Sequence, residues 1–180
     1  MKEMKHSQFQ QRLARIKLFL TDVDGVLTDG AIYMSGTEET KRYSIHDGLG
    51  IKLLQRAGIK VGWVSSRPSP ATTLRARELK ISYLVQQKDR LSKAEAIEKI
   101  LQREKLGWDD VCYMGDDVVD ICPLKKAGVG AATANAVDEA RAAADFVTRA
   151  AGGEGAVREV IEMILKAQGK WDSIVAGYRK

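Results

Sequence analysis

Short apolar runs alternate with longer amphipathic segments along most of the chain, and this alternation restricts the possible folds more than any other feature of the sequence. We predict strands at residues 16–20, 60–64, 81–85, 111–114, 129–132 and 146–148, and helices at residues 48–57, 69–79, 92–105, 123–127, 137–144 and 156–167. Strands and helices that alternate at these intervals form right-handed crossovers, which place the strands in a parallel sheet. The prediction is an α/β, Rossmann-like fold with helices on both faces of the sheet.

One insertion interrupts the alternation after the first strand. Residues 31–34 and 40–44 are predicted to form a β-hairpin, because the Ser-Gly-Thr sequence between them is typical of a turn. No other segment is long enough to form a separate cap domain. The chain has 180 residues, three prolines and no low-complexity linker, so residues 1–180 are expected to form one domain.

Composition excludes several classes of partner. The net charge is +5, but the basic residues are scattered between acids and form no long block, so we expect no nucleic-acid partner. The charged N-terminal 15 residues have no apolar signal core, and no run approaches the roughly 20 apolar residues that span a membrane. Cys112 and Cys122 lack metal-ligand spacing and are expected to be reduced thiols of a cytoplasmic protein.

Acidic residues follow two of the predicted strands. Asp22 and Asp24 come after the first strand, and Asp116, Asp117 and Asp120 come after the fourth. Side chains alternate along a strand, so the first two acids point to the same side, where their charges repel unless a cation relieves them. Ligands of parallel sheets bind beyond the carboxyl ends of the strands. The two acidic clusters therefore predict one divalent-metal site, with one carboxylate left to do chemistry.

Two further polar side chains are expected at the same edge of the sheet: Ser65 follows the second strand and Lys93 follows the third. This set suits phosphoryl transfer through a covalent intermediate. Asp22 can attack phosphorus, and Asp24 can protonate the leaving oxygen and then deprotonate water. Mg²⁺ is expected as the cofactor, because it takes oxygen ligands and needs few carboxylates. A hydroxyl and an ammonium group would hold the remaining phosphate oxygens.

The order of these motifs resembles the haloacid dehalogenase superfamily: Asp-x-Asp, a hydroxyl residue, a lysine and Gly-Asp-Asp-x-x-Asp after successive strands. Longer motifs extend the likeness to nearly all of residues 17–168. They resemble the 3-deoxy-D-manno-octulosonate 8-phosphate phosphatase family, at residues 22–30, 32–33, 41, 47–51, 67–69, 75–77, 115–117 and 152–159.

The resemblance implies a capless hydrolase that releases phosphate from a small acidic sugar phosphate and serves lipopolysaccharide synthesis. It also implies a homotetramer in which neighbouring subunits complete each active site. By position, Asp22 is the nucleophile and Asp24 the acid/base, while Asp22, the Asp24 carbonyl and Asp116 hold Mg²⁺. Residues expected at the substrate and its phosphate are Ser44, Ile45, His46, Asp47, Gly48, Ser65, Arg67, Arg75 and Lys93.

Two departures from the family pattern lie near the expected substrate. Ser65-Ser66-Arg67 stands where the family usually has Thr-Gly-Arg, so Ser66 adds a side chain where glycine is usual. The segment before Lys93 is longer than the family pattern and contains a second lysine, Lys88. We prefer Lys93 as the phosphate ligand because it opens a helix and lies at the expected distance before Asp116.

Several alternatives stay open from sequence. A phosphatase for a sialic-acid-type 9-phosphate would share the same motifs. A signalling receiver domain also gathers acids at strand ends, and a catalytically silent scaffold subunit would need no Asp24. Among single residues, Asp29 supports either the turn or the site, and Asp117 and Asp120 are metal ligands or support the ligands. Residues 152–159 form a turn before a helix, which we favour, or a phosphate cradle.

Overall fold

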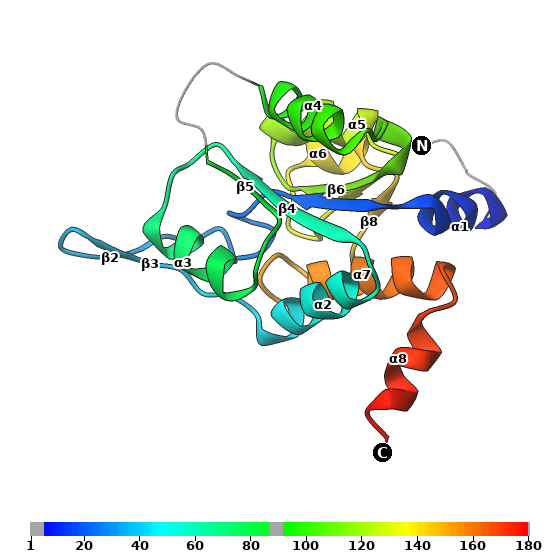
Figure 1. Ribbon diagram of the computed structural model, residues 1–180. Helices are drawn as coiled ribbons and strands as arrows, with labels where there is room; N and C mark the ends of the chain where they lie inside the picture. Colours follow the sequence, from blue (N-terminus) through cyan, green and yellow to red (C-terminus); the bar gives the residue numbers. More distant parts are fainter. Residues whose placement is uncertain (1–5, 87–91, 180) are drawn as a thin grey trace.

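A six-stranded parallel sheet forms the centre of the protein (Figure 1), as predicted. The computed structural model describes residues 6–86 and 92–179. The strands lie in the order β5-β4-β1-β6-β7-β8, and every neighbouring pair is parallel. Their bounds are β1 Leu18–Thr21, β4 Lys60–Ser65, β5 Tyr83–Gln86, β6 Val111–Gly115, β7 Val129–Ala132 and β8 Phe146–Val147.

Helices cover both faces of this sheet because the side chains of its buried strands alternate between two apolar clusters. Phe19 of β1 points into the cluster shared with α1, α2 and α7, whereas Leu18 and Leu20 point into the cluster shared with α4, α5 and α6. Figure 1 shows α4, α5 and α6 on one side of the sheet and α2 and α7 on the other. The helices are α1 His6–Arg15, α2 Ile45–Arg56, α3 Pro70–Glu78, α4 Lys93–Glu104, α5 Ile121–Lys126, α6 Asp138–Ala143, α7 Ala156–Ala167 and α8 Trp171–Gly177, with short 3₁₀ turns η1 Trp108–Asp110 and η2 Val118–Asp120.

The predicted hairpin is present but shorter than expected. Its strands are β2 Tyr33–Ser35 and β3 Glu38–Thr40, and they project from one end of the sheet (Figure 1). The prediction of a strand over residues 41–44 was wrong. That segment leads into α2, which begins three residues earlier than predicted because the Ser44 hydroxyl accepts a hydrogen bond from the Asp47 backbone N–H at 3.4 Å. In the described residues the hairpin is the insertion at this edge, and no cap domain accompanies it.

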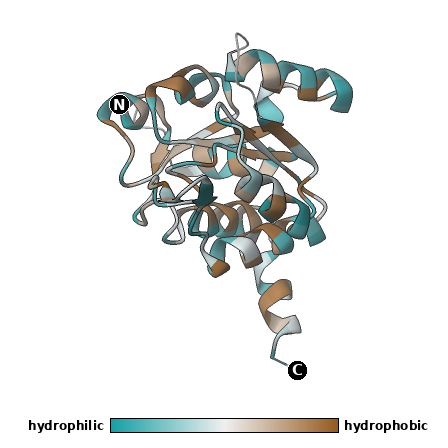
Figure 2. Ribbon diagram, turned by 90° about the vertical axis from the view of Figure 1, so that its left-hand side faces the viewer, coloured by the Kyte–Doolittle hydropathy of each residue, from teal (hydrophilic) through white to brown (hydrophobic). Residues whose placement is uncertain are grey.

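Two helices were not predicted. Helix α1 has Phe9 and Leu13 four residues apart, a helical spacing, and Leu13 is fully buried against the sheet. Helix α8 follows α7 and extends from the body of the protein, as both ribbon views show (Figures 1 and 2), while Ile174 packs against the core and Arg56 of α2 donates to the Tyr178 hydroxyl at 3.2 Å. Within the described residues no helix is long and apolar enough to cross a membrane. Lys88 lies outside the described residues.

Candidate active site

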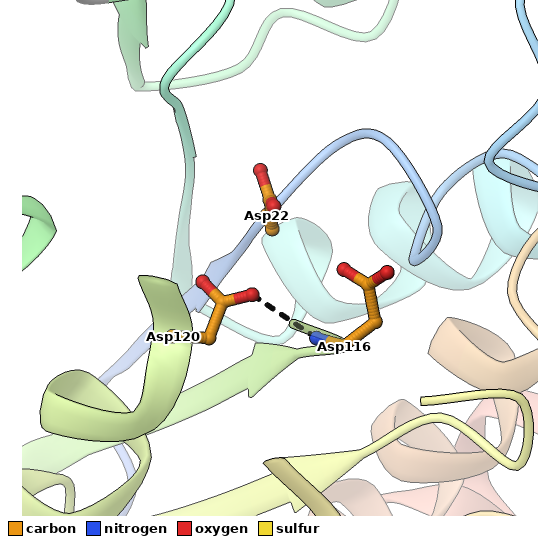
Figure 3. Close-up of side chains that lie close together, drawn as sticks. All are labelled: Asp22, Asp116 and Asp120. Atoms are coloured by element: carbon orange, nitrogen blue, oxygen red, sulfur yellow. Dashed lines mark hydrogen bonds between the residues drawn. The ribbon is translucent and has the colours of Figure 1, made fainter. Parts of the chain in front are cut away.

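The two acidic clusters meet at the carboxyl edge of the sheet. Strands β1 and β6 are parallel neighbours, and the backbone N–H of Asp22 donates to the carbonyl of Met114 at 2.9 Å. Asp22 therefore leaves β1 next to the residues that follow β6. Figure 3 shows Asp22, Asp116 and Asp120 converging, and one oxygen of each lies within 4.8 Å of the others. The predicted proximity of the two clusters is confirmed.

Asp22 is held in a defined orientation. Its side chain is 10% exposed, its Oδ1 accepts a hydrogen bond from the Val23 backbone N–H at 2.7 Å, and its Oδ2 lies 2.6 Å from Lys93 Nζ. Burial raises the pKa of Asp22 to about 6, against the opposing effect of the Lys93 charge. Lys93 is 4% exposed; burial disfavours its charge, but Asp22 and Asp120 outweigh this and raise its pKa. The ammonium group thus stays charged beside Asp22.

Asp120 is a fully buried carboxylate whose oxygens are already engaged. It accepts hydrogen bonds from Lys93 Nζ at 2.7 Å and from the Tyr113 hydroxyl at 2.5 Å. It also accepts from the backbone N–H of Asp116 at 3.1 Å, drawn as a dashed line in Figure 3, and from that of Asp117 at 3.3 Å. Asp120 therefore orients Lys93 and the Asp116 loop, while Asp117 accepts from the Val118 N–H and caps η2.

Asp116 has the properties of an oxygen ligand. Its Oδ1 is buried and has no hydrogen-bond partner in the described structure, and burial together with the charges of Asp22 and Asp120 raises its pKa to about 8. A bound cation would offset the repulsion between these carboxylates and stabilise the ionised form of Asp116. Gly25 adopts φ +85°, and a Cβ there would lie 1.9 Å from Asp116 Oδ2, so glycine is required for this approach. The oxygens of Asp22 and Asp116 suit a hard divalent cation such as Mg²⁺.

Asp24 lies on the hairpin side of the site. Its Oδ1 is 2.6 Å from Nζ of Lys41, a lysine whose side chain is completely buried. The cluster of converging carboxylates consists of Asp22, Asp116 and Asp120 and does not include the Asp24 side chain. A metal contact through the Asp24 backbone carbonyl stays a prediction. Glu39, which precedes Lys41 by two residues, completes this part of the site and was not predicted from sequence.

The segment after β4 forms a tight polar turn. The Ser65 hydroxyl accepts from the Arg67 backbone N–H at 3.1 Å and lies 3.0 Å from the Arg67 carbonyl, to which it donates. The Arg67 guanidinium forms an ion pair with Glu39 of the hairpin. Ser66, the departure from the family pattern, has an exposed side chain. The sheet thus places Ser65 and Arg67 on the predicted edge, next to the hairpin base.

The segment from Ser44 to Gly48 divides into exposed and buried positions. Ile45 is 74% exposed and His46 is exposed, so both are accessible. Gly48 packs against Arg75, because a Cβ at Gly48 would lie 2.5 Å from Arg75 Nη2. The structure therefore brings the start of α2 and the Arg75 side chain of α3 together.

Asp47 is oriented differently from its neighbours. It is 1% exposed, and its Oδ1 accepts a hydrogen bond from the Arg158 backbone N–H in the first turn of α7 at 2.7 Å. Burial raises its pKa to about 6, opposed by the backbone hydrogen bonds from Arg158 and Gly155. This carboxylate joins α2 to the N-terminus of α7, and a direct contact of Asp47 with substrate stays a prediction.

Two supporting turns surround the Asp22 loop. The backbone N–H of Gly153 donates to the Val26 carbonyl at 3.0 Å, and a Cβ at Gly152 would lie 1.8 Å from the Gly25 carbonyl. The favoured interpretation of this glycine segment, a turn before a helix, is confirmed. Asp29 accepts from the Ala31 N–H at 3.0 Å, so it supports the turn into the hairpin.

Comparisons with known proteins agree with this geometry. A haloacid dehalogenase-like hydrolase family model matches residues 84–161. The chain is 39% identical over 158 residues to the Escherichia coli K12 protein 3-deoxy-D-manno-octulosonate 8-phosphate phosphatase KdsC, covering 87% of this chain and 83% of that protein. The crystal structure of the Moraxella catarrhalis phosphatase of the same name, in complex with magnesium, phosphate and KDO, matches with a TM-score of 0.93 at 36% identity and covers 97% of this chain and 99% of that one. A cobalt-bound Haemophilus influenzae homologue matches with a TM-score of 0.88 at 37% identity, covering 94% and 100% of the two chains.

A capless parallel sheet with Asp-x-Asp on its first strand and a second acidic cluster on the neighbouring strand defines a haloacid dehalogenase-like hydrolase. Within that class, the chain shares 39% identity over 87% of its length with a curated relative. The chain belongs to the 3-deoxy-D-manno-octulosonate 8-phosphate phosphatase family.

Proposed function

We propose that this protein is a Mg²⁺-dependent phosphatase that hydrolyses 3-deoxy-D-manno-octulosonate 8-phosphate to the free sugar acid and phosphate. The observation that carries the proposal is the buried Asp22, 2.6 Å from Lys93 and close to Asp116, whose Oδ1 has no partner among the described residues. The similarity to the KdsC proteins supports the substrate. On this proposal the protein serves lipopolysaccharide synthesis in the cytoplasm.

The reaction proceeds in two balanced steps. First, a carboxylate oxygen of Asp22 bonds to phosphorus, the bond from phosphorus to the sugar oxygen breaks, and Asp24 gives its proton to that oxygen. Second, Asp24 takes a proton from water, the water oxygen bonds to phosphorus, and the aspartyl phosphate bond breaks. Inorganic phosphate leaves, and both carboxyl groups return to their starting states.

Charge stabilisation comes from the groups around Asp22. The Lys93 ammonium lies beside the attacking carboxylate and offsets the charge on the phosphoryl oxygens. Asp22, the Asp24 carbonyl and Asp116 would hold Mg²⁺, which would supply further positive charge at the phosphoryl group. The Ser65 hydroxyl is assigned to donate a hydrogen bond to a phosphate oxygen. To do so it must give up the hydrogen bond that it donates to the Arg67 carbonyl in the absence of substrate.

Substrate recognition is assigned to Ser44, Ile45, His46, Asp47, Gly48, Arg67 and Arg75, together with a neighbouring subunit. Apolar side chains are exposed on the hairpin segment and on α3: Ile32 is 44%, Met34 60% and Leu74 68% exposed. Exposed apolar groups gathered in one region are typical of protein contacts. We propose a homotetramer in which another subunit supplies the missing walls of each site.

A phosphate-release assay tests the proposed function. The parent chain with Mg²⁺ should hydrolyse 3-deoxy-D-manno-octulosonate 8-phosphate faster than a sialic-acid-type 9-phosphate, and Asp22→Asn should reduce turnover to a trace. The control Asp138→Asn changes a carboxyl that is 98% exposed and should leave the rate unchanged. A preference for the 9-phosphate would reassign the substrate. Phosphorylation of one residue per chain without turnover would instead favour a receiver domain. Absence of any reaction with either phosphate would favour a scaffold subunit.

A further inference from the structure

Lys41 is a buried cation at the base of an exposed hairpin. Its side chain is 0% exposed, and its Nζ lies 2.6 Å from Asp24 Oδ1 and 3.6 Å from Glu39 Oε1. It also donates a hydrogen bond to the Thr72 hydroxyl at 3.1 Å. Burial of an ammonium group is costly unless the charge is paired and hydrogen-bonded. The contacts of Lys41 therefore define a built environment for this charge.

Ion pairs connect Lys41 through Glu39 to a further charged residue, Arg67. Glu39 accepts hydrogen bonds from the Arg67 guanidinium and from the Ser69 hydroxyl, the latter at 2.6 Å. The Arg67 contact holds the pKa of Glu39 at about 2, so Glu39 stays ionised. When Asp24 is ionised, the charges of Asp24, Lys41, Glu39 and Arg67 alternate in sign and sum to zero. Lys41 and Glu39, the two inner groups, each have contacts on two sides, and these contacts fix the Lys41 ammonium next to Asp24.

The spacing of residues along the hairpin explains how it reaches this position. Glu39 and Lys41 are two residues apart and contact the catalytic side, whereas Arg42 contacts Asp29 and Glu154. This alternation follows from the pleat of an extended chain. The base of the hairpin is therefore fastened on both sides, independently of any contact made by its tip.

We propose that Lys41 is a positioning residue for Asp24, an inference that rests on the proposed function. The ammonium group binds Oδ1 and leaves Oδ2 as the oxygen that exchanges the proton. Oδ2 gives its proton to the sugar oxygen as the bond from phosphorus to that oxygen breaks and Asp22 bonds to phosphorus. In the second step the same oxygen takes a proton from the attacking water. The hairpin is thus part of the proton-transfer machinery.

The test compares leaving groups. A sugar alkoxide needs a proton to leave, whereas p-nitrophenolate leaves without one, and kcat/KM reports the steps up to departure of the leaving group. Lys41→Met should lower kcat/KM for 3-deoxy-D-manno-octulosonate 8-phosphate by about 10- to 100-fold, within the range of general acid catalysis, and that for p-nitrophenyl phosphate by less than about threefold. A purely structural role would lower both values equally.

Three further variants make the result decisive. Thr72→Val keeps the Lys41 charge but removes the hydrogen bond from its ammonium group to the Thr72 hydroxyl, together with the contact of that hydroxyl with Tyr43. It should show the same unequal loss in weaker form, even where Lys41→Met fails to fold. Asp24→Asn should show the unequal loss most strongly. Lys126→Met removes a lysine whose side chain is 45% exposed and should change neither value.

The outcomes separate this inference from the proposed function. Absence of hydrolysis by the parent chain, or an equal loss on both esters in Asp24→Asn, overturns the mechanism and this inference with it. Unequal loss in Asp24→Asn with equal loss in both Lys41→Met and Thr72→Val overturns the positioning role alone. Unequal loss in Lys41→Met or in Thr72→Val supports it.

Discussion

The ammonium group of Lys93 lies 2.6 Å from Oδ2 of Asp22, and both side chains are at most 10% exposed. The two residues come from distant parts of the chain: Lys93 is the first residue of α4, and Asp22 directly follows β1. The pair joins the expected nucleophile to the expected phosphate ligand before any substrate binds. Loss of this ion pair should therefore lower both the free energy of unfolding and the rate of phosphate release.

Lys93→Met should destabilise the protein by roughly 3–5 kcal/mol, because it leaves Asp22 and Asp120 buried without their cation. Urea unfolding in EDTA measures this loss. The double variant Lys93→Met with Asp22→Asn should recover part of it, since one of the stranded charges is removed. A single-variant loss below about 1 kcal/mol contradicts the role given to this ion pair.

Removal of divalent metal should abolish phosphate release, and added Mg²⁺ should restore it. Asp116→Asn should weaken Mg²⁺ binding, measured by calorimetry, by more than the roughly 10- to 100-fold that loss of a supporting group costs. In EDTA the same variant should unfold at no lower temperature than the parent, because it removes a carboxylate repelled by Asp22 and Asp120. Full activity in metal-free buffer would rule out the site.

Asp47 should make the protein less stable as pH rises from about 4 to about 6. Its folded pKa is about 6, above the ordinary 3.8, so the folded state binds more protons than the unfolded state in that window. Asp47→Asn keeps an acceptor for the Arg158 N–H but has no charge to bury. Its stability relative to the parent should therefore improve by up to about 3 kcal/mol between pH 4 and pH 7.5.

Urea unfolding across this pH range checks the Asp47 prediction. Asp138→Asn serves as the control, because that carboxyl is 98% exposed and should produce no such trend. A stability difference between Asp47→Asn and the parent that stays constant with pH would show that burial does not raise the pKa of Asp47.

Removal of residues after Gln168 should reduce kcat/KM for the sugar phosphate more than for p-nitrophenyl phosphate. Helix α8 projects from the body of the chain (Figure 1), so we expect it to contact a neighbouring subunit's site. The Arg158 guanidinium lies 5.2 Å from the centroid of the Trp171 ring. The truncation removes this contact and should therefore also lower the stability of the folded chain. Light scattering of the intact protein should give the mass of four chains. One chain per particle with full activity would refute the shared site.

The sequence predicted the sheet, most helix bounds and the edge at which the site lies. These features depend on local patterns, such as the apolar run before Asp22 and the capping box formed by Ser92 and Glu95 at the start of α4. The start of α2 was missed because Ser44 caps it through Asp47, a signal that competed with the β-like residues before it. Helix α1 was missed although Phe9 and Leu13 have helical spacing.

Sequence alone determined which residues are ionisable and which strand ends carry them, because these follow from residue type and periodicity. Only the tertiary structure decided which charges are paired and which are free. Asp47 contacts a backbone N–H 111 positions away, and Lys93 contacts Asp120 27 positions away. Such contacts depend on how distant elements pack against the sheet. That packing gives both oxygens of Asp120 hydrogen-bond donors, while Oδ1 of Asp116 has no partner in the described part of the chain. It also places the Lys41 ammonium beside Asp24.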